Sequence, residues 1–117
     1  MGQVFNKKRQ IIVKIFDNVP REKAFYFFTS MGNYTGENAS SLKEFREKIR
    51  SVDIKSLEFH LYRGDFERWI ADVLEDKNLA TEINRVKTLN YAGCALRNVL
   101  ESIIDKHYEK LVAALRK

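Results

Sequence analysis

The sequence contains one cysteine, one proline and two histidines. A single thiol, Cys94, cannot build an internal disulfide framework or an all-cysteine metal site, and it favours a reducing compartment. No apolar run approaches the roughly 20 residues that a membrane-spanning helix needs. Residues 1–6 have neither the apolar segment of a signal peptide nor a myristoylation pattern. We therefore expect a cytoplasmic protein with no membrane association.

Charge of one sign is in modest excess. The 117 residues include 21 Lys and Arg against 16 Asp and Glu, which gives a net charge of +5. An excess of this size can serve solubility alone. With 44% hydrophobic residues, the chain can bury one compact core, and a second independent core is not expected at this length. We predict that residues 1–117 form a single domain.

Apolar periodicity predicts helices through the second half of the chain. Over residues 91–116, apolar residues recur at spacings of three and four, which predicts one long helix with a single apolar face. Thr88 and Asn90 are available as caps before it. A shorter helix is expected to start after Asp76, and the pattern Ser41–Glu44 is a capping box that begins another helix upstream.

The segment Ser56–Ile70 is the most distinctive part of the chain, because it combines a His, an Arg, a Gly-Asp step and the only Trp. Asp53 can cap a helix that ends at Gly64, since glycine adopts the left-handed conformation that closes many helices. Asp65 can then cap the next helix, whose apolar residues follow at helical spacing. The segment predicts two helices joined by a tight corner.

Periodicity does not decide the N-terminal third. Residues 10–16 fit a strand or a helix, and their apolar face favours the helix. Residues 24–29 have the aromatic density of a strand, whereas Pro20 and Gly32 are helix boundary signals. Residues 30–40 are rich in turn formers and are expected to form one long loop. The predicted fold class is mainly α, a single small helical domain of about five to six helices, with a short β element near 24–29 as the open alternative.

Several motifs between about residues 20 and 80 resemble those of a known family. The motifs are Ala24–Phe28, Gly32, Tyr34–Gly36, Ser41–Leu42 and Leu57–Ile70. Together they resemble a prokaryotic, mainly archaeal, family of small domains of unknown function. The N-terminal arm and the long last helix are less distinctive. The resemblance implies a stable fold of its own and implies no activity, cofactor or substrate.

Candidate binding residues are those whose side chains can recognise a ligand: His60, Arg63, Asp65, Trp69 and Tyr34. His60 can transfer a proton near Asp65, or it can be a core-edge imidazole bonded to a backbone carbonyl and a carboxylate. Arg63 can clamp an anion, or it can bridge to Asp65 or Glu67 and hold the corner. Trp69 can stack on a base or a sugar, or it can belong to the core. We favour the structural role for His60, Arg63 and Trp69.

No catalytic or metal-binding pattern is present. His60 and His107 are far apart in the sequence, and Cys94 has no partner at a spacing typical of zinc sites. The glycines near Tyr34 are too few for a phosphate-binding loop. We expect no catalytic residues, no bound metal and no cofactor.

Two non-enzymatic functions follow from these features. The first is a protein-interaction or regulatory module, because the apolar stripe of the last helix continues to Leu115 and can outrun the core. A protein partner or a second copy of the chain would then cover it. The alternative is weak nucleic-acid binding, in which exposed tyrosines stack on bases and N-terminal basic residues contact phosphates. The residues involved would be Tyr26, Tyr34, Lys7–Arg9, Lys14, Arg21 and Lys23.

Overall fold

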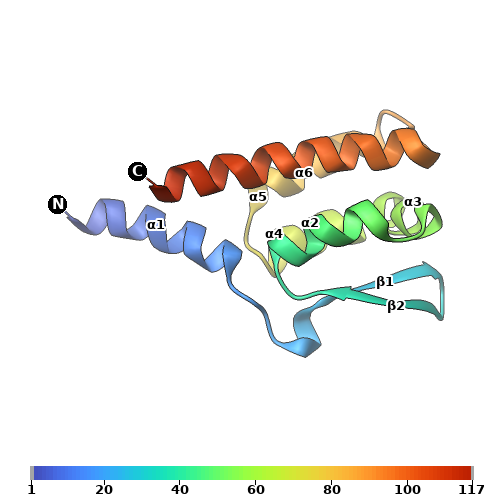
Figure 1. Ribbon diagram of the computed structural model, residues 1–117, viewed down its shortest axis with the longest axis horizontal. Helices are drawn as coiled ribbons and strands as arrows, with labels where there is room; N and C mark the ends of the chain where they lie inside the picture. The colour runs from blue at the N-terminus through green and yellow to red at the C-terminus, as the bar shows by residue number, and fades with distance from the viewer. Residues whose placement is uncertain (1, 117) are drawn as a thin grey trace.

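Six α-helices and one β-hairpin make up the described part of the chain (Figure 1). The computed structural model describes the backbone of residues 2–116 and the side chains of residues 9–116. The elements follow in the order α1 (Gly2–Phe16), β1 (Phe25–Ser30), β2 (Asn33–Ala39), α2 (Leu42–Ser51), α3 (Ile54–Arg63), α4 (Asp65–Asp72), α5 (Lys77–Lys87) and α6 (Gly93–Arg116), with a 3₁₀ turn at Arg21–Lys23. The predicted mainly α class is confirmed, and the strand alternative holds near 24–29.

The hairpin overturns the prediction of a long loop over residues 30–40. β2 pairs antiparallel with β1 through the two-residue turn Met31–Gly32. The turn needs a positive φ at its second residue, and Gly32 provides it at 80°. Within β2 only Ala39 is fully buried, so this strand lacks the apolar alternation by which half-buried strands are recognised. Its polar composition was therefore mistaken for that of a loop.

The two faces of β1 differ because side chains alternate along a pleated strand. Phe25 and Phe27 are buried in the core. Tyr26 and Phe28 are half-buried on the opposite face, where both rings lie beside Tyr34 of β2. The ring centroids are 5.7 Å apart for Tyr26 and Tyr34 and 5.4 Å apart for Phe28 and Tyr34. The hairpin thus carries an aromatic cluster on its outer face as well as on its inner one.

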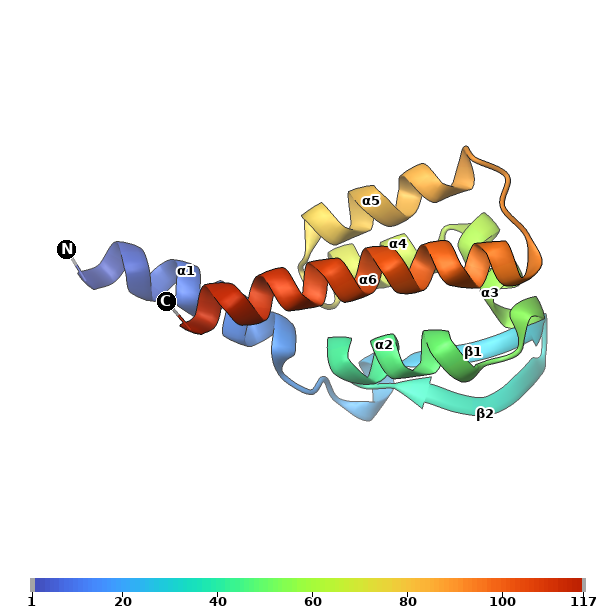
Figure 2. The same cartoon turned by 45° about the horizontal axis from the view of Figure 1, so that its top comes forward.

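The long helix α6 packs against α1, α2, α3 and α5. Figure 2 shows α5 along one side of α6 and α2 along the other, with the hairpin on the far side of α2. Between the hairpin and the helices lie the large aromatic side chains of the core, Phe25, Phe27, Phe45, Phe66 and Trp69. α6 begins at Gly93, not at Tyr91, and Thr88 closes α5 instead of capping α6.

Three predicted N-caps are confirmed. The side chains of Ser41, Asp53 and Asp76 each accept a backbone N–H bond in the first turn of α2, α3 and α5. Caps of this kind stabilise a helix by about 1 kcal/mol each, because they satisfy donors that have no partner inside the helix. The starting points of α2, α3 and α5 are therefore specified by residues in or next to their own first turns.

The helix predicted for residues 10–16 is confirmed as the second half of α1, which lies beside the C-terminal half of α6 (Figure 1). Ile12 and Ile15 are buried, Leu111 is partly buried against the core, and Arg9 Nη1 donates to the carbonyl oxygen of Leu115 at 2.8 Å. α1 thus covers part of the stripe on the last helix that the sequence left free. Among the described residues, no helix is both long and apolar enough to cross a membrane.

Candidate functional site

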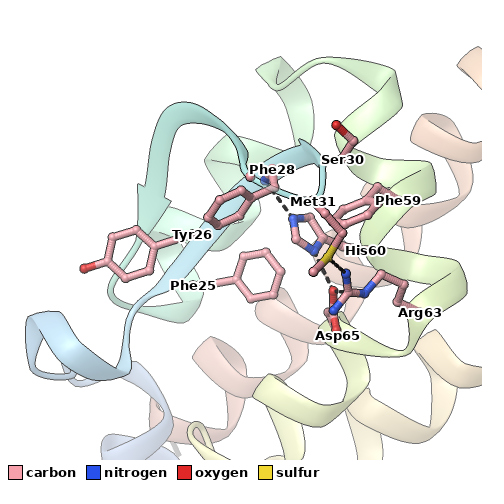
Figure 3. A pocket seen from close by; sticks show the side chains of 10 residues that line it. Phe25, Tyr26, Phe28, Ser30, Met31, Phe59, His60, Arg63 and Asp65 are labelled. Carbon is pink, nitrogen blue, oxygen red and sulfur yellow. Dashed lines mark hydrogen bonds and ion pairs between the residues drawn. The ribbon is translucent and has the colours of Figure 1, made fainter.

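A pocket of about 330 Å³ opens between the hairpin turn and the corner that joins α3 to α4 (Figure 3). β1 and its turn form one wall, and α3 with the first residue of α4 forms the other. Aromatic rings from Phe25, Tyr26, Phe28 and Phe59 line most of it. Of the five predicted site residues, the pocket brings together His60, Arg63 and Asp65.

The imidazole of His60 links the hairpin to the helical corner. His60 is only 4% exposed. Its Nε2 accepts the backbone N–H of Phe28 at 2.8 Å, and its Nδ1 lies 2.8 Å from Oδ2 of Asp65. Because Nε2 is an acceptor, the neutral ring carries its proton on Nδ1 and donates it to the carboxylate. The sequence predicted a carbonyl partner; the observed partner is an N–H, and both ring nitrogens are already used.

The direction of the Phe28 N–H explains why this bond forms. Thr35 of β2 donates its hydroxyl to the carbonyl oxygen of Phe27, so that carbonyl points toward β2. In a trans peptide group the N–H points the opposite way from the carbonyl, which turns the Phe28 N–H away from β2. This donor would be unpaired at the open edge of β1 without the imidazole. His60 therefore provides the acceptor for a backbone N–H at the edge of β1, and this hydrogen bond links α3 to the strand.

Asp65 does not cap α4, so the predicted role of its carboxylate is wrong. The N-cap of α4 is Gly64, which makes no side-chain cap bond and has a φ of 81°. The Asp65 carboxylate is occupied by other donors: His60 Nδ1, Arg63 Nε at 3.3 Å and Arg68 Nη1 at 3.4 Å. A buried imidazole N–H and two guanidinium groups outcompete the backbone N–H groups of the first turn for the same two oxygens.

Arg63 bridges to Asp65, as one of its two predicted roles required, and it also stands at the mouth of the pocket. Its guanidinium carbon lies 4.7 Å from the centroid of the Phe59 ring, a cation–π contact. Its Nη1 donates to the sulfur of Met31 in the hairpin turn at 2.8 Å. In Figure 3, Met31 lies beside Phe59 with its sulfur toward Arg63. The Phe59 ring and the Asp65 carboxylate thus hold the guanidinium of Arg63, and one of its N–H groups points to the Met31 sulfur.

Comparison with known proteins decides the family of the chain. Residues 22–116 match the family of unknown function DUF5752. The chain belongs to this family. The match extends past residue 80, so the family region includes α5 and α6 and every element that builds the pocket. No curated protein and no solved structure gave a match.

The other two predicted residues of this DUF5752 domain lie outside the pocket lining. Trp69 is buried in the core, and its Nε1 donates to the carbonyl oxygen of Lys23 at 2.7 Å. Tyr34 is 45% exposed on the outer face of the hairpin, beside the pocket residue Phe28. Sequence reasoning missed Met31 and Phe59. Phe59 precedes Arg63 by four residues, and this helical spacing was an available signal for their contact.

A second buried His–Asp pair was also missed. His107 Nε2 of α6 lies 2.6 Å from Oδ2 of Asp76, while Oδ1 of Asp76 caps α5. Both side chains are buried, so the pair ties the start of α5 to α6. The exposed thiol of Cys94 lies in the first turn of α6. In the described part of the chain, no group of three or more His, Cys, Asp or Glu side chains is arranged to hold a metal ion.

The surroundings of His60 favour its neutral form. Burial lowers the pKa of His60 below its ordinary value of 6.5; the Asp65 carboxylate opposes this shift and Arg63 adds to it. The unfolded chain therefore binds a proton at a higher pH than the folded chain. As the pH falls below 6.5, the unfolded state takes up the proton first, and folding stability decreases until the folded pKa is reached.

A pH series on His60→Gln should show this dependence. Glutamine at position 60 removes the titrating imidazole, while His107 is present in both proteins. We expect the wild-type protein to have the higher free energy of unfolding at about pH 7.5. The difference between the two proteins should decrease as the pH is lowered to about 5.5. Urea denaturation at each pH gives both free energies. A difference that stays constant or grows on acidification would contradict the assignment of a neutral, buried imidazole.

Proposed function

We propose that this protein is a non-catalytic protein-interaction or regulatory module of the cytoplasm, which holds an apolar side chain of a partner protein in the pocket beside the hairpin. One observation carries the proposal: the pocket is walled by aromatic rings, while the ring nitrogens of His60 and the carboxylate of Asp65 in its lining are already held in structural contacts. General acid–base chemistry needs a titratable group that can reach the substrate. Burial of an apolar group needs only the walls.

The size and support of the pocket fit a single anchoring side chain. Its volume of about 330 Å³ is at the lower end of the range for ligand sites, which suits one large apolar or aromatic group better than an extended ligand. The bonds of His60 to the hairpin and to Asp65 hold its two walls at a fixed separation. In a pre-formed pocket the walls lose little conformational entropy when the ligand binds, which favours affinity. Anchor pockets at the centres of protein interfaces share this property.

Photo-cross-linking in cells tests the proposal. A benzophenone amino acid replaces Tyr34, which lies beside the pocket, or Tyr62, which is 44% exposed on α3 and does not line it. We expect one protein adduct at position 34 that is absent at position 62. Filling the pocket with Ser30→Phe should abolish the adduct, whereas Thr29→Phe, at the neighbouring position of β1, should leave it. Equal adducts at both positions, or an adduct that survives Ser30→Phe, would refute the proposal.

Single-stranded nucleic acid is the second candidate partner, and the outer aromatic cluster of the hairpin favours it. Tyr26, Phe28 and Tyr34 offer adjacent half-exposed rings, and bases stack on such rings. The N-terminal charges support it less. Arg9 already bonds the carbonyl of Leu115 and Lys14 pairs with Glu75, while the side chains of Lys7 and Lys8 lie outside the described residues. Oligonucleotide binding at low salt that Tyr34→Ala weakens would favour this candidate instead.

A homodimer through the last helix has less support than a different protein partner. The apolar stripe that suggested it is partly covered by α1, with Ile12 and Ile15 buried and Leu111 partly buried. The pocket, by contrast, is open. We therefore assign the interaction to the hairpin end of the molecule.

A further inference from the structure

Arg63 is a fixed cation at the mouth of the pocket. Stacking on Phe59 and the ion pair with Asp65 restrict the guanidinium, although 46% of the side chain is exposed. Planar guanidinium groups held in this way have lost part of their conformational entropy before a ligand arrives. The group is therefore ready to bind an acceptor at a defined position beside the aromatic walls.

The acceptor that Arg63 Nη1 now has is weak and easily displaced. It is the thioether sulfur of Met31, and thioethers are poor hydrogen-bond acceptors. Met31 is 78% exposed and belongs to the two-residue turn, so its side chain can leave without opening the core. A carboxylate in its place would be a much better acceptor and would form an ion pair with the guanidinium.

The charge around the mouth is unbalanced toward positive. The guanidinium groups of Arg63 and Arg68 share the single carboxylate of Asp65, and the neutral His60 adds no charge. The nearby carboxylate of Glu67 is taken by Lys87. An incoming carboxylate would therefore complete the charge balance of the mouth, and an incoming cation would be repelled.

We propose that the occupant of the pocket is the C-terminal residue of a partner protein, with an apolar side chain in the pocket and its α-carboxylate on Arg63 Nη1 in place of Met31. This inference rests on the proposed function and specifies its ligand. Arg63 itself lines the pocket, so a single residue that carries both an apolar group and a carboxylate fits the site. In an extended segment the neighbouring side chain points to the opposite face, which makes an internal acidic neighbour a poorer fit.

The test is an NMR titration of the full chain with three probes: N-acetylphenylalanine, its C-terminal amide, and the amidated dipeptide N-acetyl-Phe-Asp. We expect the free acid to bind about 10-fold more tightly than the amide, which corresponds to about 1.4 kcal/mol. The dipeptide, whose carboxylate sits on the next residue, should bind like the amide. Shifts should centre on the Met31 methyl group and the Phe59 ring.

Two matched variants separate recognition from net charge. Arg63→Gln should bring the affinities of the acid and the amide to within about 2-fold of each other. Lys55→Gln, which removes an exposed positive charge from the same helix at a position that does not line the pocket, should keep the preference. The Phe28 amide resonance checks that each variant keeps the link to His60.

Four results would overturn this inference. Equal binding of the acid and the amide, or equal loss of preference in both variants, refutes the carboxylate contact and leaves the proposed function intact. Tight binding of the dipeptide refutes the chain terminus as the source. Failure of all three probes to bind refutes the pocket as a site for an apolar group, and with it the proposed function.

Discussion

His60→Ala is expected to lower the free energy of unfolding by about 3 kcal/mol. The substitution leaves the Phe28 N–H without its acceptor and removes the imidazole donor from the Asp65 carboxylate. It also opens a cavity among aromatic rings, since the imidazole centroid lies 4.8 Å from that of Phe25 and 4.9 Å from that of Phe59. Urea denaturation followed by circular dichroism measures the loss.

Lys55→Ala is the control for this variant, because Lys55 is exposed on the same helix. Its effect should stay within about 0.5 kcal/mol. Amide hydrogen exchange gives a local readout in the same proteins: Phe28 should lose protection in His60→Ala and keep it in Lys55→Ala. A His60→Ala protein as stable as the wild type, with Phe28 still protected, would mean that the imidazole does not fasten the hairpin.

Trp69→Ala is expected to destabilise the fold by about 4 kcal/mol, which is the second large effect. The indole packs in the core with centroids 5.7 Å from Phe25 and 5.3 Å from Phe45, and its N–H holds the carbonyl of Lys23. Trp69→Phe keeps an aromatic ring and loses that hydrogen bond, so it should cost about 1 kcal/mol.

Trp69→Phe also distinguishes a core residue from a binding residue. Trp69 does not line the pocket, so this variant should bind an apolar probe such as indole with unchanged affinity. Probe affinity that falls while the unfolding free energy stays constant would show instead that Trp69 contacts the ligand.

The helical part of the fold could be predicted because its signals are local. Ser41, Asp53 and Asp76 act as caps at the positions where the sequence placed them, and Gly64 has the positive φ expected at the corner. Each of these features depends on residues within one helical turn. Two helix starts were misplaced: α6 begins at Gly93 and not at Tyr91, and Gly64 holds the N-cap position of α4 that was predicted for Asp65.

The hairpin and the site could not be predicted in the same way, because they depend on contacts between distant segments. β2 is stabilised by pairing with β1 while its own side chains are mostly polar, so its composition resembles a loop. Asp65 stands at a position typical of an N-cap, but in the folded chain its carboxylate pairs with His60 and Arg68 instead. The role of Met31 follows only from the turn that carries it across to Arg63.

The central claim is that the hairpin and the α3–α4 corner form a pre-formed pocket for an apolar group. Intermolecular nuclear Overhauser effects between the protein and bound indole test this claim most directly. The pocket walls predict contacts from the indole protons to the Met31 methyl group and to the Phe28 and Phe59 rings, and the loss of these contacts in Ser30→Phe. Indole at millimolar concentration that shows no contact with these residues, or contacts that persist in Ser30→Phe, would contradict it.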